Sequence, residues 1–406
     1  MKSTVVISVQ GLQEAPVLLP VFQFLQAQGI DESCQIRHQR SDRLVSTTLR
    51  VPIQDAAQAD RLREGLESLS AEYGLQGICF VEETVADSVG KARSYILTIL
   101  SETLAVEFYE EIFKTLQALD FRIESLHTHQ ADPEALEVGF SVSELRLLNR
   151  SGSLQADLVS ALVGMKSAHS FDFAIQEDNV FRRNKRLIVF DADMTFIQCE
   201  VINEIAKLAG KYTEVEQITR KAMAEGDNFS EALRKRVAHL KGLEVEQIEQ
   251  ITRSIPYTEG IPQLITALKR LGYKIGIISG SFDFVIRHIQ RVFGIDYAFA
   301  NQLEVADGRL TGGLVGDIVD SQAKANLLKH IAEREDLLLD QVIAVGDGAN
   351  DVEMISTAGL GIAFNAKQVL EQQATASLSS PSLLPILHFL GITPQELSEL
   401  YEGADD

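Results

Sequence analysis

Two aspartates that stand two positions apart are the first residues whose types suggest chemistry. Asp191 and Asp193 follow the apolar run 187–190. Such a run predicts a buried parallel strand, and side chains two positions apart on a strand point to the same side. Neighbouring carboxylates repel each other unless a cation lies between them, and Mg²⁺ prefers carboxylate, carbonyl and phosphate oxygens. The pair therefore indicates a magnesium site, whereas one acidic turn alone is equally typical of a solvated surface.

A second acidic loop favours the metal site. The apolar run 342–345 leads into a turn that contains Asp347 and Asp351, and the glycines of this turn allow close backbone approach. The two carboxylates offer further hard oxygen ligands for Mg²⁺. Two acidic strand ends are harder to explain as surface turns than one.

Residues suited to binding phosphate lie between these two loops. The apolar run 274–278 ends at Ser279 and Gly280, which offer a hydroxyl and backbone N–H groups to phosphate oxygens. Lys324 lies near the start of the helical stretch 321–334, where a fixed cation could stabilise charge on a transferring phosphoryl group. The four motifs together predict chemistry on a phosphate ester.

In this order the motifs resemble those of the haloacid-dehalogenase phosphatase superfamily, and within it the phosphoserine phosphatases. The resemblance covers 184–401. It implies an α/β core with a Rossmann-like parallel sheet. It also implies a phosphoric monoester hydrolase that converts O-phospho-L-serine to L-serine and phosphate with Mg²⁺, the last step of serine biosynthesis. Met194 and Ser281 depart from the family pattern, which usually has Ser and Gly there, without removing a catalytic group.

The resemblance also implies a role for each acidic residue. Asp191 is the nucleophile that forms an aspartyl-phosphate and, with Asp347, a metal ligand. Asp193 is the general acid and base, and its backbone carbonyl is a further metal ligand. Asp351 lies nearby as a direct ligand or as the partner of one. The phosphoryl oxygens are held by Ser279, Gly280, Lys324 and Asn350.

A helical insertion is expected between the first two motifs. The connection 194–278 is far longer than the usual link between strands, and helical periodicity over 201–253 predicts a small cap at about 200–258. Such a cap would lie over the site. Substrate choice is therefore expected to depend on it.

Phosphoserine carries a carboxylate and an ammonium group, so its recognition requires one fixed cation and one fixed anion. Arg236 can grip the carboxylate through two hydrogen bonds, and Glu200 can pair with the ammonium group. Met223 and Phe229 would close an apolar lid. Other interpretations stay open: a helix N-terminal acid for Glu200, a basic helical surface for Arg236, and packing within helices for the two apolar residues.

The first part of the chain contains one pattern twice. Runs with strand or helix periodicity give the order βαββαβ within 1–83 and again within 93–180, where the third strand is expected at 136–142. Each copy predicts a ferredoxin-like α+β sandwich and resembles an ACT domain. That resemblance implies amino-acid binding or pairing between chains. A glycine-rich turn is only partly present at 11–16 and is absent at 101–104, which favours a dimerising or structural role over amino-acid sensing.

Composition limits the partners and the location. The 406 residues carry a net charge of −21, which argues against binding nucleic acid or an anionic membrane surface, because both need a basic patch. The apolar runs are too short for a membrane span or a signal peptide, so a cytoplasmic protein is expected. Cys34, Cys79 and Cys199 form no pattern and predict reduced thiols. Cys199 is expected to be a packed residue and not a nucleophile.

Two other function classes stay open from the sequence. One is a phosphatase or phosphotransferase that acts on another small phosphorylated metabolite. The other is a regulatory protein whose N-terminal modules sense an amino acid while the phosphatase core is idle. The regulatory class is disfavoured because Asp191, Asp193, Lys324 and Asp347 are all intact.

A zinc site is an alternative to the magnesium site. His127 and His129 alternate on an expected strand and could bind Zn²⁺ together with Cys34 or an acidic residue. A polar strand face explains the two histidines more simply.

Overall fold

The chain divides into two compact units, Met1–Gly90 and Lys91–Asp406, in a computed structural model. The part of the chain that the structure describes comprises residues 3–12, 18–28, 35–40, 44–53, 56–73, 77–84, 93–101, 106–130, 141–149, 155–225 and 229–402. Within it, no helix is both long and apolar enough to cross a lipid bilayer.

The first unit is an antiparallel sheet with two helices. Its elements have the predicted βαββαβ order, and the strands lie side by side as β2-β3-β1-β4. Apolar side chains of both helices are buried, among them Val21 and Leu25 of α1 and Leu62 and Leu66 of α2. The elements are β1 (Ser3–Leu12), α1 (Leu18–Ala27), β2 (Gln35–Arg40), β3 (Leu44–Ile53), α2 (Ala56–Tyr73) and β4 (Gly77–Thr84).

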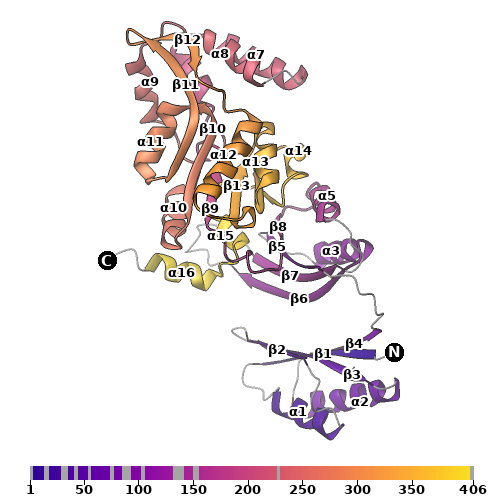
Figure 1. The fold of residues 1–406 in the computed structure, drawn as a ribbon. Coiled ribbons are helices and arrows are strands. Elements are labelled where there is room, and N and C mark those ends of the chain that lie inside the picture. Colours follow the sequence, from indigo (N-terminus) through magenta and orange to yellow (C-terminus); the bar gives the residue numbers. More distant parts are fainter. Residues whose placement is uncertain are drawn as a thin grey trace. The chain divides into compact units, whose positions relative to one another are not determined.

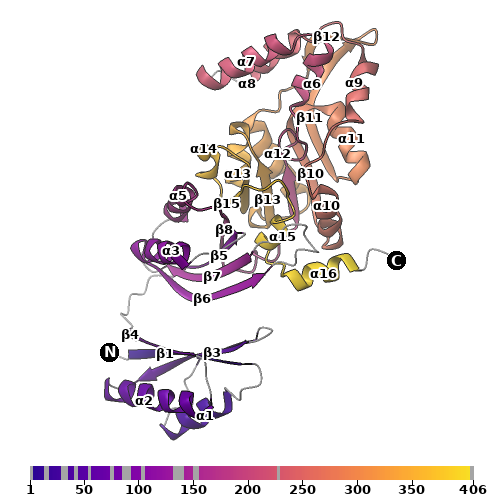
Figure 2. The same ribbon diagram turned by 180° about the vertical axis from the view of Figure 1, so that it is seen from behind.

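The second βαββαβ module begins the second unit and repeats this strand arrangement. Its strands lie in the order β8-β5-β7-β6, which matches β4-β1-β3-β2 of the first module. Helices α3 and α5 lie together on one side of this sheet (Figures 1 and 2). The elements are β5 (Arg93–Ser101), α3 (Val106–Ala118), β6 (Phe121–Gln130), β7 (Ser141–Asn149), α5 (Gln155–Met165) and β8 (Asp172–Glu177).

The predicted position of one strand in this module was wrong. The strand expected at 136–142 runs instead over Ser141–Asn149, and 131–140 lie outside the described residues. Val142, Leu145 and Leu147 are buried along it, and the strand pairs on both sides, with β5 and β6. The bounds of this central strand depend on its pairing with β5 and β6, and the local sequence does not reveal that pairing.

The rest of the second unit is built on a parallel sheet, as predicted. Six strands lie in the order β11-β10-β9-β13-β14-β15, and each neighbouring pair is parallel. The strands are β9 (Leu187–Phe190), β10 (Lys274–Phe282), β11 (Tyr297–Ala306), β13 (Val342–Gly346), β14 (Leu360–Phe364) and β15 (Ala376–Leu378). Parallel sheets of this kind carry their active sites at the carboxyl ends of the strands.

Helices cover both faces of this sheet (Figures 1 and 2). Ile188 and Phe190 of β9 point to one face, where they join α10 (Ile261–Arg270) and α11 (Asp283–Phe293) in one buried cluster. Leu187 and Val189 point to the other face, toward α12 (Ser321–Arg334) and α13 (Val352–Thr357). Both faces of β9 are therefore buried against apolar side chains, and this packing holds the strand in place up to Phe190, the residue before Asp191.

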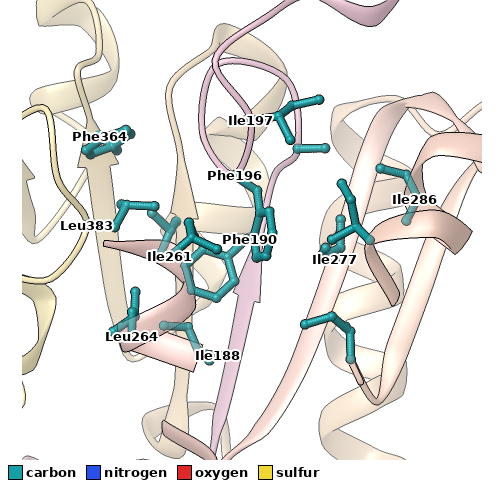
Figure 3. Close-up of a cluster of buried hydrophobic side chains, with 14 of the residues drawn as sticks. Ile188, Phe190, Phe196, Ile197, Ile261, Leu264, Ile277, Ile286, Phe364 and Leu383 are labelled. Atoms are coloured by element: carbon teal, nitrogen blue, oxygen red, sulfur yellow. The ribbon is translucent and has the colours of Figure 1, made fainter. Parts of the chain in front are cut away.

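An aromatic contact extends this core into the loop that follows β9. The rings of Phe190 and Phe196 meet edge to face, with their centroids 5.6 Å apart, and lie beside Ile261 and Ile277 (Figure 3). Phe196 and Ile197 are fully buried. The loop that contains the two aspartates is thus held at both ends by apolar packing.

The long connection after this loop is helical, as predicted. It contains α6 (Val201–Leu208), α7 (Tyr212–Glu225), α8 (Phe229–Ala238) and α9 (Val245–Thr252). The hairpin of β11 and β12 (Arg309–Val315) reaches these helices, because Leu310 and Leu243 are joined by a backbone hydrogen bond of 2.9 Å. Figures 1 and 2 show α7, α8 and β12 at the same end of the unit.

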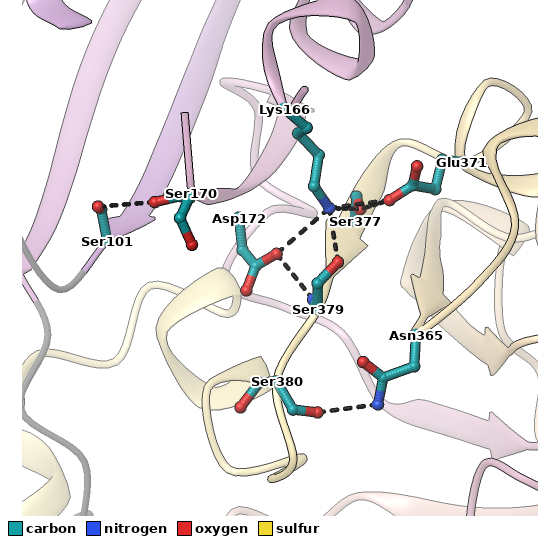
Figure 4. A network of polar contacts seen from close by, with 9 residues as sticks. All are labelled: Ser101, Lys166, Ser170, Asp172, Asn365, Glu371, Ser377, Ser379 and Ser380. Carbon is teal, nitrogen blue, oxygen red and sulfur yellow. Dashed lines mark hydrogen bonds and ion pairs between the residues drawn. The ribbon is translucent and has the colours of Figure 1, made fainter. Parts of the chain in front are cut away.

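The second module and the parallel core share one continuous sheet. β8 pairs antiparallel with β15, in the register Ala174 opposite Ala376 and Phe173 opposite Ser377. Lys166, just after α5, extends its ammonium group across this junction (Figure 4), where it lies 2.8 Å from Glu371 of α14 (Gln368–Glu371). It also donates hydrogen bonds to the hydroxyls of Ser377 and Ser379, and it lies 3.4 Å from Asp172. The predicted boundary near residue 180 stays a prediction.

The chain closes with two short helices. They are α15 (Ile386–Phe389) and α16 (Pro394–Glu402). Gln176 of β8 donates a hydrogen bond of 2.6 Å to the carbonyl of Phe389, so α15 also contacts the second module.

Candidate active site

Three carboxylates meet at the carboxyl ends of β9 and β13. One oxygen from each of Asp191, Asp347 and Asp351 lies within 4.8 Å of the others. The two strands are neighbours, and the backbone N–H of Asp191 donates to the carbonyl of Val345, 2.8 Å away. The pairing of the strands therefore brings together acidic residues that are more than 150 positions apart in the chain.

Lys324 neutralises part of this charge from within the protein. Its side chain is fully buried, and its ammonium nitrogen lies 2.8 Å from Asp191 Oδ1 and 2.7 Å from Asp351 Oδ1. Burial acts to lower the pKa of Lys324, but the two carboxylates outweigh burial and raise it. The lysine is therefore a permanent cation at this site.

One lysine does not balance three carboxylates. Burial, followed by the charges of Asp191 and Asp351, raises the pKa of Asp347 to about 8. Burial and Asp191 raise the pKa of Asp351 to about 6, against the opposing effect of Lys324. A cluster of hard oxygens with this excess of negative charge fits a divalent cation such as Mg²⁺. Within the described residues, these three form the only group of at least three metal-binding side chains.

Two glycines make room for the acidic loop after β13. A Cβ atom on Gly346 would lie 2.5 Å from the carboxyl carbon of Asp351, and one on Gly348 would lie 2.3 Å from Asn350 Oδ1. The N–H of Gly348 donates to Asp351 Oδ2 over 3.0 Å. The predicted close backbone approach at these glycines is therefore present, and Asn350 lies half-buried in the same turn, Ala349–Asp351.

Asp193 is not one of the three clustered carboxylates. Its Oδ2 accepts a hydrogen bond of 3.1 Å from the N–H of Val201, and its Oδ1 is buried without a partner among the described residues. Burial, Glu200 and Asp191 raise its pKa well above the usual value, against the effects of Val201 and the Ser281 hydroxyl. Asp193 can therefore carry a proton at neutral pH.

The two residues that depart from the family pattern differ in their surroundings. Met194 has a φ of 60° and is 44% exposed, so its side chain faces solvent from a left-handed backbone conformation. Ser281 is buried. Neither side chain takes the place of a carboxylate in the three-carboxylate cluster.

Cys199 lies next to the site, close to Asp193 and Glu204. Burial and the nearby charges of Asp193 and Glu204 raise the pKa of its thiol to about 12. A thiol with this pKa stays protonated at neutral pH, which supports the expectation that Cys199 is not a nucleophile.

Ser279 and Gly280 lie where β10 departs from regular pairing. Ser279 is buried, and its hydroxyl oxygen accepts a hydrogen bond from the N–H of Ser281, 3.0 Å away, so its own proton remains available to a ligand. A Cβ atom on Gly280 would lie 2.9 Å from the ring of Phe229. The start of α8 therefore packs directly on this loop.

Arg236 and Glu200 approach the same region from the helical insertion. Arg236 is only 9% exposed, so it does not form a basic surface. Its Nη1 makes one long hydrogen bond, 3.5 Å, to Thr219, and its Nε has no partner within the described residues. Burial lowers the pKa of Arg236, whereas Glu200 and Asp193 act to raise it.

Glu200 precedes α6 without capping it. It occupies the N-cap position, yet its side chain makes no capping hydrogen bond. Burial raises its pKa, and Arg236 opposes this effect. The structure therefore does not support a helix-capping role for Glu200, and it leaves the carboxylate available beside a buried guanidinium.

Several predicted residues fall outside the described part of the chain. Met223 lies on α7, but its side chain is not among the described ones, and the same holds for His129 and Cys79. Cys34 lies outside entirely. The zinc alternative built on His129 and Cys34 is thus not tested.

Two residues near the site were not assigned a role from the sequence. Thr195 donates its hydroxyl proton to Asp347 Oδ1 over 3.0 Å and so orients this carboxylate. Its position two residues after Asp193 was a signal that could have been used. Asn301, on β11, donates a hydrogen bond to the carbonyl of Gly280. That contact depends on strand pairing and has no local signal.

Comparison with known proteins places the chain in a family. The haloacid dehalogenase-like hydrolase family matches residues 188–356. A phosphoserine phosphatase of Mycobacterium tuberculosis is 32% identical over 409 residues, a match that covers 100% of this chain and 96% of that protein. The chain belongs to the phosphoserine phosphatase family of haloacid dehalogenase-like hydrolases.

Other similar proteins match a smaller share of the chain. A phosphoserine phosphatase of Archaeoglobus fulgidus is 46% identical over 219 residues, which cover 54% of this chain and 64% of that protein, less than two thirds of its length. The crystal structure of a probable phosphoserine phosphatase from Vibrio cholerae is 29% identical, has a TM-score of 0.55, and covers 76% of this chain and 88% of that one. This likeness agrees with the parallel core described above.

Proposed function

We propose that this protein hydrolyses O-phospho-L-serine to L-serine and phosphate through an aspartyl-phosphate on Asp191, with Mg²⁺, as the last step of serine biosynthesis. One observation carries the proposal. A buried lysine and three carboxylates, which suit phosphoryl transfer, lie beside a buried arginine and a half-buried glutamate, which suit an amino-acid group. Phosphoserine contains both kinds of group.

Asp191 is suited to attack phosphorus. Its Oδ1 accepts hydrogen bonds from the N–H of Ala192, 2.7 Å away, and from Lys324. Both contacts use Oδ1, which leaves Oδ2 to form the bond to phosphorus while the bond from phosphorus to the serine oxygen breaks. The phosphate dianion would otherwise repel this carboxylate, so Lys324, Ser279 and the N–H groups near Gly280 must screen the phosphoryl oxygens.

Asp193 is suited to move the proton. Its raised pKa lets it begin protonated and donate to the leaving serine oxygen. It is then the base that takes a proton from the water that attacks the aspartyl-phosphate, which restores Asp191 and releases phosphate. Its uncommitted Oδ1 is the atom that can carry this proton.

The acidic cluster would hold the metal. Asp191 and Asp347 are the side-chain ligands that we propose, with the backbone carbonyl of Asp193, and Asp351 supports them from its contact with Lys324. Mg²⁺ bound there would neutralise charge on the phosphate oxygens. Thr195 keeps Asp347 oriented for this role.

The helical insertion would read the amino-acid group of the substrate. Arg236, whose guanidinium has little to bind in the described structure, would take the carboxylate, and Glu200 would take the ammonium group. Phe229, and Met223 from α7, would cover the site against water. Asn350 would contribute to holding the phosphate.

A steady-state assay tests this function. Phosphoserine should be hydrolysed in the presence of Mg²⁺ and not after chelation, and it should be preferred over phosphoethanolamine, phosphothreonine and sugar phosphates. Asp191→Asn serves as the inactive control. Equal turnover of all these esters would favour a phosphatase for other small metabolites. No turnover of any ester by the wild type would favour a regulatory protein with an idle core.

The location and assembly of the protein are proposed from the sequence. We expect a cytoplasmic protein that forms a homodimer through the two N-terminal modules. Light scattering on the full chain, and on a chain that begins at Lys91, measures this directly. A full chain that is monomeric at micromolar concentration would contradict the dimer.

A further inference from the structure

We propose that Asn301 is a positioning residue of the phosphoryl site, because its carboxamide fixes the loop of Ser279 and Gly280 relative to the helix that carries Lys324. Asn301 is 2% exposed. Its two polar atoms bind backbone groups of two different segments, one on each side. The inference rests on the proposed phosphatase function and adds a residue to it that does not touch the substrate.

The first contact supports an irregular part of β10. In the pairing of β10 with β11, Ile278 lies opposite Phe299, but the next pair is Phe282 opposite Asn301. Three residues of β10, Ser279 to Ser281, therefore stand against the single residue Ala300 of β11. Such a bulge takes backbone groups out of the ladder and re-aims side chains. Asn301 Nδ2 donates to the displaced carbonyl of Gly280 over 2.8 Å, which replaces the missing ladder bond.

The second contact reaches the start of α12. Asn301 Oδ1 accepts a hydrogen bond of 2.8 Å from the N–H of Val319. The next residue, Asp320, caps α12, because its carboxylate accepts from Ala323 N and its carbonyl accepts from Lys324 N, both over 2.9 Å. The position of Val319 therefore sets where α12 begins.

Together the two contacts connect opposite sides of the phosphate. Ser279 and Gly280 would hold phosphoryl oxygens from β10, and Lys324 would hold them from α12. Asn301 is the side chain that joins these segments behind the site. A Cβ atom on Gly280 would lie 3.5 Å from the carbonyl of Val319, so the two segments are already in close contact. A shift of either one would change the spacing of the groups that must surround the phosphoryl group.

Only a carboxamide of this length satisfies both backbone groups. Aspartate has the same shape and can accept from Val319, but it cannot donate to Gly280 and would place a carboxylate oxygen against a carbonyl oxygen. Serine is too short to reach both, so at least one buried backbone group would lose its partner or take up water. Asn301→Asp and Asn301→Ser therefore perturb the spacing in different ways.

The test compares these variants with a matched control. Gln176→Leu removes another buried amide donor, 4% exposed, which binds the carbonyl of Phe389 away from the site. Because a misplacement of about 1 Å can cost roughly 100-fold in rate, we expect kcat/KM to fall by about 100-fold in Asn301→Asp and by at least about 10-fold in Asn301→Ser. The control should keep wild-type kcat/KM even if its Tm falls as much.

Two further readouts separate positioning from general damage. The loss should be the same for phosphoserine and for p-nitrophenyl phosphate, because both place a phosphoryl group in the same loop. The Kd of inorganic phosphate, measured by calorimetry, should rise in both variants while the helicity of the protein is unchanged. If Asn301→Asp does not fold, Asn301→Ser carries the test.

The possible failures are distinguishable. Wild-type kcat/KM and phosphate affinity in the folded variants would overturn the inference, and so would a loss confined to phosphoserine or one equalled by Gln176→Leu. A wild-type protein that binds phosphate but hydrolyses no ester would overturn the proposed function alone. In that case, an unchanged phosphate Kd in the variants would still overturn the inference.

Discussion

Replacement of Arg236 by alanine tests whether the helical insertion recognises an amino acid. If Arg236 holds the substrate carboxylate, Arg236→Ala should lose discrimination between phosphoserine and phosphoethanolamine. Phosphoethanolamine has the same phosphate and ammonium groups but no carboxylate. Its hydrolysis should therefore change little in the variant.

The structure indicates how large this loss should be. Arg236 is buried, its Nη1 makes a long hydrogen bond of 3.5 Å to Thr219, and its Nε has no partner among the described residues. Most of its hydrogen-bonding capacity is therefore open to a ligand. Removal of one partner of a buried, hydrogen-bonded charge pair costs about 2–5 kcal/mol. At about 1.36 kcal/mol for each factor of ten, the ratio of the two kcat/KM values should fall by roughly 30-fold to several thousand-fold.

The assay measures kcat/KM for both esters in wild type and variant, because the ratio cancels general damage to the fold. Arg220→Ala is the matched control. Arg220 lies on α7 as an exposed arginine that pairs with Glu216 one turn away, and it should leave the ratio unchanged. An Arg236→Ala ratio equal to that of wild type would refute the reasoning, and the broader metabolite phosphatase would become the better proposal.

Three other predictions concern the carboxylates of the candidate site. Asp191→Asn should fold and yet lose turnover almost completely, since an amide does not attack phosphorus; substantial residual hydrolysis would contradict the covalent mechanism. Asp193→Asn should slow phosphoserine far more than p-nitrophenyl phosphate, whose leaving group needs little protonation, and equal losses would assign Asp193 another role. Without metal, the pKa values of about 8 for Asp347 and about 6 for Asp351 exceed the usual 3.8, so the folded protein holds protons that the unfolded chain has released. The free energy of unfolding should therefore fall as pH rises from about 4 to about 8. Mg²⁺ should raise Tm more at pH 8 than at about pH 5.5, because protons compete with the metal for these carboxylates at the lower pH. An equal rise of Tm at both pH values would argue against this cluster as the metal site.

The parts of the site that the sequence could predict are local. Asp191, Asp193 and Asp347 lie at most three residues after an apolar run, so the same short segment predicts both the strand and the acidic group. Lys324 could be predicted as a cation on a helix, but its contacts with both Asp191 and Asp351 depend on how α12 packs. Asp351 was expected to bind the metal directly or to contact a metal ligand, and its carboxylate forms an ion pair with Lys324.

The parts that could not be predicted depend on pairing between distant segments. Asn301 acquires its role from a bulge in the neighbouring strand, which no local pattern records. The junction of β8 and β15 was also missed, because β15 spans only Ala376–Leu378, too short for alternation to be recognised. The position of β7 was wrong for a similar reason, since its pairing with β5 and β6 decides which residues are buried.

The shared sheet determines where the protein can meet another strand. A sheet ends in a row of unpaired N–H and C=O groups, and another chain can add to that row. β8 covers this row on β15, so within the described sheet the outermost strand on this side is β6, at the far side of the second module. The second module therefore prevents another chain from pairing with β15 of the parallel core. A chain shortened to begin at Asn184 would leave β15 open, and its light scattering should rise with concentration well before that of the chain that begins at Lys91.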